Sequence, residues 1–235
     1  MSGDRDRLKR AAALYALEEI EEGMVVGLGT GSTARFLIEG LGARVAQGLK
    51  IRAIPTSKAT ALLARRCGIP LAGFEEERRI DLTIDGADEV ERRSLDLIKG
   101  RGGALLREKI VAAASARLVI VVDDGKLVDR LGERTPVPVE VAEFGWQATA
   151  LALERLGSVA RLRRCDGGDP YVTDGGNLIL DCDFGAIKDP AALEREIALT
   201  VGAFESGLFV GRASAVVSAS EEGIEVLERD PRRRR

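Results

Sequence analysis

Apolar runs and amphipathic segments alternate along the first half of the chain. Each run is short and rich in Val, Ile and Leu, as in strands buried on both faces of a parallel sheet. Each following segment has apolar residues three and four positions apart, as on one face of a helix. The expected strands are 24–28, 49–54, 80–84 and 118–122, and the expected helices are 4–22, 33–41, 58–66 and 105–116. This order predicts an α/β fold, with a parallel sheet covered by helices on both faces.

The pattern changes near Thr135, where two prolines follow within three residues. Beyond this point short apolar runs alternate with two amphipathic segments, and Asp189 precedes the second as a favourable N-cap. The expected strands are 137–141, 158–163, 177–180, 208–210 and 215–218, and the expected helices are 146–156 and 190–201. The predicted parts are a parallel-sheet Rossmann-like domain of residues 1–131 and 210–229, a smaller α+β domain of residues 132–209, and a tail of residues 230–235.

Polar residues follow the expected strands of the first domain at the point where each strand ends. They fall at Thr30 to Thr33, Thr56-Ser57, Asp85 to Asp88 and Asp123 to Lys126. In open parallel sheets, ligands bind beyond the carboxyl ends of the strands. The sequence therefore predicts one site at this edge, built from segments that are far apart along the chain.

The chain of 235 residues contains no histidine, which excludes a Ser-His-Asp triad, a Cys-His pair and a histidine metal site. Acid–base chemistry must then rest on Asp, Glu, Lys, Cys or Tyr. The three cysteines, Cys67, Cys165 and Cys182, have no CxxC spacing, and their odd number is typical of a reducing compartment. We expect a cytoplasmic protein without a metal centre.

The net charge of −3 argues against a general nucleic-acid partner, because proteins that bind nucleic acids usually carry a strong excess of basic residues. One basic cluster, Arg232 to Arg235, follows Pro231 at the end, where we expect a solvated tail. We find no apolar signal core and no stretch of ~18 apolar residues that could span a bilayer. The sequence therefore predicts neither a nucleic-acid nor a membrane partner.

A glycine-rich segment, Gly27 to Thr33, joins an expected strand to an expected helix. Backbone N–H groups at a helix N-terminus bind anions, and glycines allow close approach. A dinucleotide fingerprint requires a third glycine where Ser32 stands, and an acid after the second strand, where Pro55-Thr56-Ser57 stands. A methyl-donor nucleoside site also favours such an acid, and a tight turn remains the simplest alternative. We expect a loop that holds a phosphate or sugar hydroxyls.

Two further segments carry charge toward the same edge. Asp85-Gly86-Ala87-Asp88-Glu89 follows a buried strand, although such a turn can also simply cap the next segment. Lys99 to Gly103 leads into a helix in which Glu108 lies three residues after Leu105. That spacing places Glu108 on the packed side of the helix, whereas charged helix positions usually face solvent. A buried carboxylate requires a partner or a task.

Together these segments resemble type A ribose-5-phosphate isomerases. The shared blocks are GLGTGST (27–33), PTS (55–57), DGADE (85–89), KGRGGALLREKI (99–110), DDGKLVDRLG (123–132), PVPVEV (136–141), VTDGGN (172–177) and GLF (207–209). The resemblance implies that D-ribose 5-phosphate and D-ribulose 5-phosphate are interconverted in pentose phosphate metabolism, without a cofactor or metal. It also implies a homodimer and a Glu108 general base. The substrate-binding residues that it implies are Lys9, Thr30, Gly31, Ser32, Thr33, Gly86, Ala87, Gly100, Arg101, Gly102 and Lys126.

The reaction explains these residue types. Ring opening requires an acid and a base, for which Asp85 and Asp88 are both candidates, and Lys99 is expected to stabilise charge on the oxygen. Burial should raise the pKa of Glu108 while a nearby cation keeps it ionised. The phosphate has two candidate places, Lys9 with residues 30–33 or the 99–102 loop with Lys126, and we favour the first.

Other functions on similar sheets remain alternatives at this point. A sugar-phosphate sensor of a transcription regulator requires a DNA-binding domain, and only ~23 residues precede the first expected strand. An amino-sugar phosphate deaminase is expected to use a histidine, and a coenzyme A transferase a glutamate in another context. The isomerase fits the residues best.

Overall fold

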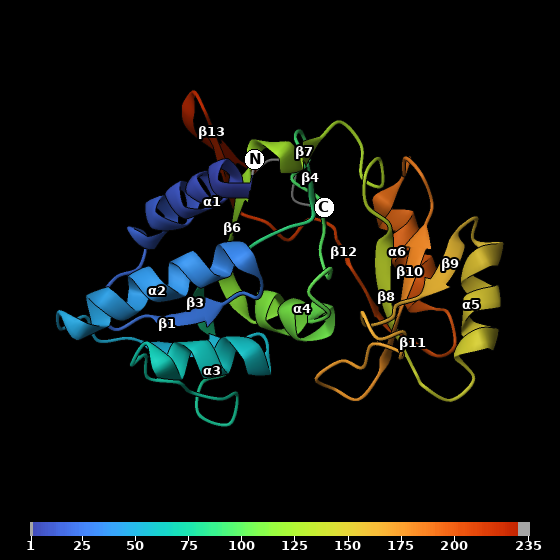
Figure 1. The fold of residues 1–235 in the computed structure, drawn as a ribbon, viewed down its shortest axis with the longest axis horizontal. Helices are drawn as coiled ribbons and strands as arrows, with labels where there is room; N and C mark the ends of the chain where they lie inside the picture. The colour runs from blue at the N-terminus through green and yellow to red at the C-terminus, as the bar shows by residue number, and fades with distance from the viewer. Residues whose placement is uncertain (1, 230–235) are drawn as a thin grey trace.

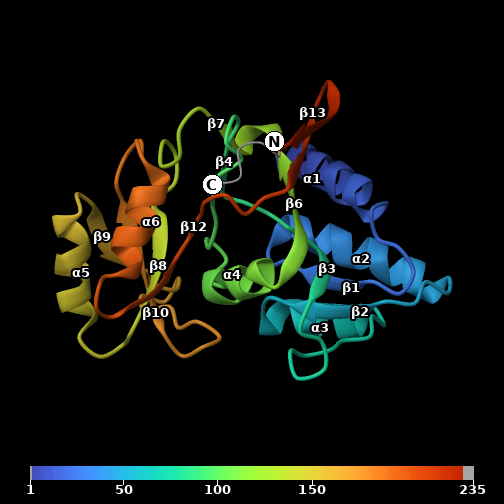
Figure 2. The same cartoon turned by 180° about the vertical axis from the view of Figure 1, so that it is seen from behind.

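The computed structural model describes residues 2–229 (Figure 1). The expected tail of residues 230–235, with its basic cluster, lies outside the described residues. Two layered parts lie side by side in both views (Figures 1 and 2). The helices are α1 (Ser2–Leu17), α2 (Ser32–Ala46), α3 (Lys58–Arg66), α4 (Leu105–Ala113), the 3-10 helix η1 (Asp124–Lys126), α5 (Trp146–Arg155) and α6 (Pro190–Ala198).

A six-stranded sheet forms the centre of the larger part, in the order β14-β13-β6-β3-β1-β2. All neighbours pair in parallel except β13 and β14, which form an antiparallel hairpin at one edge. The strands are β1 (Val25–Leu28), β2 (Arg52–Pro55), β3 (Ile80–Asp85), β6 (Ser115–Asp123), β13 (Ala215–Ser220) and β14 (Gly223–Glu228). The predicted parallel sheet and the return of the late strand to it are confirmed.

Strand β6 shows why the sheet is buried on both faces. Its residues alternate, as the pleat requires: Val119 and Val121 pack into a cluster with α1 and α2, whereas Leu118, Ile120 and Val122 pack into a second cluster on the other face. On that second face α4 contributes Val111 against β1 and β3. The α/β class with helices on both faces is confirmed.

The smaller part is an antiparallel sheet in the order β11-β8-β10-β9, packed with α5 and α6 around a separate apolar cluster. Asp189 caps α6 as expected, since its side chain accepts from the N–H of Ala192 at 3.0 Å. The strands are β8 (Val137–Val141), β9 (Val159–Leu162), β10 (Leu178–Asp183) and β11 (Ala203–Ser206). The expected domain limits at 131/132 and 209/210 stay a prediction.

A third sheet, β12-β5-β4-β7, joins the two parts and was not expected from the sequence, although β12 falls within the expected strand 208–210. The other three strands are two or three residues long, too short for a period-2 pattern to be visible. Figure 2 shows the segment through β12 crossing from the smaller part to the larger one. The strands are β4 (Glu89–Glu91), β5 (Leu97–Ile98), β7 (Leu127–Val128) and β12 (Leu208–Phe209).

Two helices differ in length from their expected ranges for identifiable reasons. The first helix ends at Leu17 because the guanidinium of Arg44 takes the carbonyls of Leu17, at 2.6 Å, and Ile20, at 3.1 Å. Helix α2 continues past its glycines to Ala46, and Gly42 is required within it because a Cβ there would come within 2.7 Å of the Cys67 Cβ. Within residues 2–229, no helix combines the length and apolarity required to cross a membrane.

Replacing Gly27 by alanine should lower the free energy of unfolding by about 1–3 kcal/mol, because the core between β1, β3 and α4 has no room for a methyl group. Gly27 pairs with Thr83, and a Cβ at position 27 would overlap the Thr83 hydroxyl and lie 2.8 Å from Val111 Cγ1. Urea unfolding measures the effect. Gly167→Ala is the control, since nothing lies within 4 Å of its Cβ. Equal midpoints for both variants would contradict this account.

Candidate active site

A cavity of about 380 Å³ opens at the carboxyl ends of the parallel strands, on the side that faces the smaller part. It contains every site residue expected from the sequence except Asp85. Its lining residues are Lys9, Thr30, Gly31, Ser32, Thr33, Gly86, Ala87, Asp88, Lys99, Gly100, Arg101, Gly102, Glu108 and Lys126.

The first glycine loop, residues 27–33, lies between β1 and α2. Gly31 has φ 109 and sits at the N-cap of α2, where no side chain caps the free backbone N–H groups. The left-handed backbone favours glycine at this position. The N-terminus of α2 therefore presents unpaired donors and a positive dipole end toward the cavity.

Thr30 lines the cavity, but its hydroxyl is engaged on the opposite side of the loop. Its Oγ1 lies 2.7 Å from Thr56 Oγ1, 2.9 Å from Ser57 Oγ and 3.1 Å from Thr60 Oγ1. Ser57 in turn caps α3 by accepting from the N–H of Thr60. This hydroxyl cluster fastens the loop to α3, which leaves Ser32 and Thr33 as the hydroxyls free to serve a ligand in the way the sequence led us to expect.

Asp85 lies beneath the cavity floor at the end of β3, where it is 1% exposed. Its Oδ1 accepts from the N–H groups of Thr30, at 3.1 Å, and Gly86, at 2.7 Å. A Cβ at position 29 would overlap Asp85, so the approach of the two segments requires Gly29. The carboxylate binds the loop above it and, through Oδ2, the ammonium of Lys99 at 3.0 Å.

Lys99 is the cation at the centre of this buried cluster. Its Nζ donates to the carbonyl of Gly86 at 2.6 Å and lies 3.4 Å from Glu108 Oε2. Burial alone lowers the pKa of Lys99, but the carboxylates of Asp85 and Glu108 more than offset this, so the pKa is raised. Lys99 therefore remains an ammonium.

Glu108 lies in the first turn of α4 on the packed face, with 4% exposure, so the prediction from helix periodicity is confirmed. Its Oε2 is buried and has no hydrogen bond with any described residue; the 3.4 Å approach of Lys99 is an ion pair by distance only. A buried carboxylate oxygen without a hydrogen bond is costly. Glu108 is among the residues that line the cavity, although its Oε2 is itself buried.

Burial raises the pKa of Glu108 to about 8. The ammonium of Lys99 lowers the pKa, whereas the nearby carboxylates of Asp85 and Asp88 raise it. The expected cation is present, but burial outweighs its effect, so the pKa of Glu108 is raised rather than lowered. A carboxyl group with a pKa near neutrality can both give and take a proton.

Asp88 and Glu89 are neighbours that turn in different directions. Asp88 lines the cavity, and its Oδ2 accepts from the N–H of Arg101 at 2.9 Å. Glu89 is 1% exposed and accepts from the N–H groups of Gly132 and Arg134, each at 2.7 Å. One acid of the pair faces the cavity, and the other anchors the segment that leads into the smaller part.

Two further lysines, from separate elements, line the cavity. Lys9 projects from α1, with Asp6 Oδ1 3.8 Å from its Nζ, and Lys126 comes from η1. With Lys99 they give the cavity three ammonium groups. A bound dianion can therefore be compensated at this site.

Sequence reasoning missed the contacts that the smaller part makes with this site. Lys109 is buried beside Glu108, with Nζ 3.0 Å from Glu194 and 2.7 Å from Glu205, so that α4 is tied to α6 and β11. Arg163 and Tyr171 reach the second glycine loop, residues 99–103. No local pattern announces these contacts, because the partners lie more than sixty residues away along the chain.

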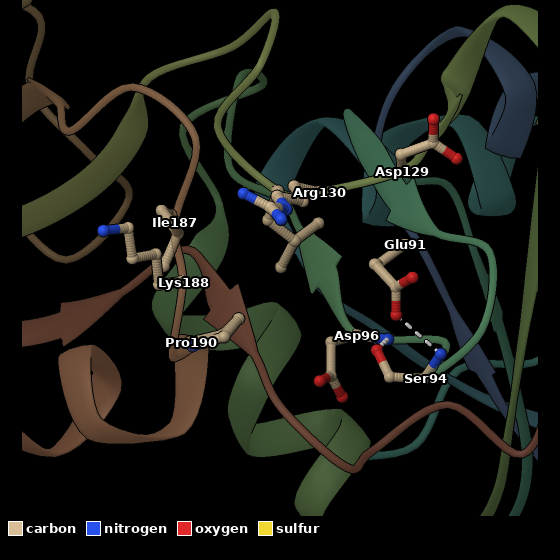
Figure 3. A pocket seen from close by; sticks show the side chains of 9 residues that line it. Glu91, Ser94, Asp96, Asp129, Arg130, Ile187, Lys188 and Pro190 are labelled. Atoms are coloured by element: carbon tan, nitrogen blue, oxygen red, sulfur yellow. Dashed lines mark hydrogen bonds between the residues drawn. The ribbon is translucent and has the colours of Figure 1, made fainter.

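A second cavity, of about 390 Å³, lies between the β4 turn and the start of α6 (Figure 3). Two of its three acids are engaged: Glu91 accepts from the N–H of Ser94 at 2.6 Å, and Asp96 accepts from that of Gly211 at 2.8 Å. None of the expected site residues lines it. Among the described residues, no group of three or more His, Cys, Asp or Glu is placed to hold a metal ion.

Comparison with known proteins explains this arrangement. The family model of ribose 5-phosphate isomerase A (phosphoriboisomerase A) matches residues 52–223. The ribose-5-phosphate isomerase A of Gloeobacter violaceus is 60% identical over 95% of this chain and 97% of its own. The chain belongs to the ribose-5-phosphate isomerase A family. It is thus an aldose–ketose isomerase, as the resemblance implied.

Other members of the family agree in sequence and fold. The ribose-5-phosphate isomerase A of Gluconobacter oxydans is 55% identical over 97% of this chain and 100% of its own. A solved D-ribose-5-phosphate isomerase in complex with phospho-erythronic acid has a TM-score of 0.93 and 40% identity, covering 96% of this chain and 99% of its own. The Plasmodium falciparum ribose 5-phosphate isomerase has a TM-score of 0.92 and 37% identity, covering 96% and 99%.

Glu108→Gln should change stability in a pH-dependent way. A folded pKa of about 8 against an ordinary 4.5 means that the folded chain holds this proton more tightly than the unfolded chain. The stability present below pH 4.5 is therefore lost as pH rises toward 8. Glutamine has no proton to lose. The melting temperature of the variant, taken relative to that of the parent chain, should therefore rise by several degrees from pH 5 to pH 8.5.

The matched control is Glu154→Gln, which changes an exposed glutamate on α5. Its melting temperature should follow that of the parent chain at every pH. If the Glu108→Gln difference is the same at both pH values, the burial of this carboxyl does not govern its ionisation.

Proposed function

We propose that the chain interconverts D-ribose 5-phosphate and D-ribulose 5-phosphate through an enediolate, and that Glu108 moves the proton between C2 and C1. The observation that carries the proposal is Glu108, a residue of the cavity lining whose buried Oε2 has no hydrogen bond within the described residues and lies 3.4 Å from Lys99. Exclusion of bulk water helps a base that passes a proton between adjacent carbons, and Glu108 is only 4% exposed.

The proton transfer requires one base and one source of positive charge. Ionised Glu108 takes the proton from C2 of the open-chain aldose and returns it to C1, while the proton on the C2 hydroxyl moves to O1. Negative charge develops on the oxygen in between, and the Lys99 ammonium is the nearby stabilising group. The pKa of about 8 suits a group that must accept and then release a proton near neutrality.

For ring opening we favour Asp88 over Asp85. Asp88 lines the cavity with one carboxylate oxygen held by the N–H of Arg101, which leaves the other for the sugar. Asp85 is beneath the floor and is already paired with Lys99 and two N–H groups. Asp85 therefore acts through Lys99, by holding its ammonium in place.

The phosphate is assigned to the N-terminus of α2 with Lys9. The uncapped N–H groups at residues 31–33, the hydroxyls of Ser32 and Thr33, and the Lys9 ammonium offer donors for a dianion at one end of the cavity. Glu108 and Lys99, which we assign to the reacting carbons, line the same cavity. A solved relative is described in complex with phospho-erythronic acid, a phosphorylated sugar acid, which fits a cavity that takes such a ligand.

A homodimer in the cytoplasm is part of the same proposal. The resemblance is its main support, and the three cysteines are free, as suits a reducing compartment. Phe144, Leu199 and Val201 are 98%, 83% and 91% exposed near the β8–β11 pair, which is apolar surface that a second copy could cover.

Glu108→Gln should lower kcat by at least ~10², because the side chain keeps its size and loses its ability to accept a proton. A coupled assay of ribulose 5-phosphate formation measures this, with Glu154→Gln as the control that keeps full activity. For the parent enzyme, the fraction of ionised Glu108 grows as pH rises, so kcat/KM should increase up to about pH 8 and then level off. Retained activity in a folded Glu108→Gln variant would place the base elsewhere.

Lys9→Ala should raise KM by about 10-fold with little change in kcat, because an ion pair with the phosphate contributes to binding and lies away from the reacting carbons. Steady-state kinetics with ribose 5-phosphate measure both constants. Arg10→Ala is the matched control, since it removes a neighbouring exposed charge of α1. An unchanged KM in Lys9→Ala, with a raised KM in Lys126→Ala, would move the phosphate to the opposite end.

A further inference from the structure

Arg163 connects the smaller part to the wall of the candidate cavity. It follows β9 directly, and its side chain is only 14% exposed. The guanidinium is held by Asp181 of β10, with Nε 3.0 Å from Oδ2 and an ion pair between Nη2 and Oδ1. The remaining nitrogen, Nη1, donates to the carbonyls of Gly100, at 2.8 Å, and Arg101, at 3.1 Å. Arg163 itself is not among the residues that line the cavity, whereas Gly100 and Arg101 are.

The peptide group between Gly100 and Arg101 carries this contact through to Asp88. Its carbonyl accepts from Arg163, and its N–H donates to Asp88 Oδ2 at 2.9 Å. The order of contacts is thus Asp181, Arg163, the 100–101 peptide and Asp88. Hydrogen bonds in such a series polarise one another, and a cation on the carbonyl makes the N–H a stronger donor.

The loop requires such a support because its backbone is unusual. Gly100 has φ 103 and Gly103 has φ 77, both in the left-handed region. Glycine adopts many backbone conformations, so contacts from outside the loop are required to hold it in this one. Tyr171 adds a second contact by donating to the carbonyl of Gly102 at 3.3 Å. A planar, bidentate guanidinium fixes two carbonyls and a carboxylate at once, which a lysine ammonium cannot do with the same geometry.

We infer that Arg163 is a positioning residue, which orients Asp88 and the 100–102 backbone toward the substrate through the Gly100–Arg101 peptide. The inference rests on the proposed function, in which Asp88 serves ring opening. In that step a proton leaves the anomeric hydroxyl, the bond from C1 to the ring oxygen breaks, and the ring oxygen receives a proton. Arg163 touches neither Glu108 nor Lys99, so the later proton transfer does not depend on it.

The two steps can be measured separately, because ribulose 5-phosphate carries its phosphate on O5 and cannot close a furanose ring. In D2O, loss of the C1 proton signal of ribulose 5-phosphate reports proton removal by Glu108 without any ring chemistry. Turnover of ribose 5-phosphate requires both steps. The variants are Arg163→Gln and Arg163→Lys, and Arg164→Gln is the matched control: Arg164 is exposed and donates to the carbonyl of Gly168 in its own turn.

For Arg163→Gln we expect kcat with ribose 5-phosphate to fall about 10-fold or more, with C1 exchange within about 2-fold of the parent enzyme. Arg163→Lys should restore little of the loss, and Arg164→Gln should match the parent. Unchanged kcat in Arg163→Gln overturns the inference. An equal fall of turnover and exchange, or a loss restored by lysine, assigns Arg163 a structural role only and also overturns it.

Should Arg163→Gln not fold, Asp181→Asn tests the same contact by removing the carboxylate that holds the guanidinium, and Tyr171→Phe removes the separate hydrogen bond to the Gly102 carbonyl. Asp181→Asn should then reproduce the selective loss of turnover, and full activity in both variants would contradict the inference. Failure of the proposed function gives a different result: Glu108→Gln would keep its C1 exchange.

Discussion

The site depends on one buried ammonium shared between two buried carboxyl groups. Lys99 lies 3.0 Å from Asp85 and 3.4 Å from Glu108, and all three side chains are almost fully removed from water. One cation cannot compensate two carboxylates at once in such surroundings. Asp85 has two backbone N–H donors in addition to Lys99, whereas Glu108 has only the longer contact. Burial raises the pKa of both carboxyl groups. Glu108 has the fewer hydrogen-bond donors and is the one of the two acids that lines the cavity.

The fold brings these three residues together from segments that share no local sequence pattern. Asp85 ends a parallel strand, Lys99 follows a two-residue strand of the third sheet, and Glu108 begins α4. The third sheet is the element that matters most for this meeting, because it folds residues 89–98 back so that Lys99 returns over the end of β3. The chain crosses between its two parts through the same sheet. Motion of the smaller part relative to the larger one would therefore displace Lys99 and the second glycine loop directly.

Local patterns in the sequence predict much of this fold and site. They span only a few neighbouring residues, which is why they do not predict the rest. The long Val/Ile/Leu runs predicted the parallel sheet, and the three-and-four spacing around Leu105 predicted the burial of Glu108. The short strands β4, β5 and β7 carry too few residues for any periodicity, and β14 is exposed along most of its length. Thr30 was expected in the substrate site from the glycine loop and the family resemblance, and it lines the cavity. Only the tertiary structure reveals that its hydroxyl also joins the loop to Thr56 and to Thr60 of α3. Arg163 likewise has no signal near it, since its partners lie on another part of the chain.

The burial that activates Glu108 works against the stability of the fold. A carboxyl group with a raised pKa binds its proton more tightly in the folded chain, and every deprotonation event near neutrality costs folding free energy. The surrounding structure offsets this cost by holding the helix from outside: Lys109, the next residue, is bound by Glu194 and Glu205, and its ammonium lies 5.0 Å from the ring of Phe209. Lys99 lies on the same ring at 5.6 Å. Two adjacent positions of α4 therefore differ in role. Lys109 fixes the helix through its ion pairs with Glu194 and Glu205. Glu108 keeps a carboxylate oxygen that has no hydrogen bond within the described residues, beside Lys99.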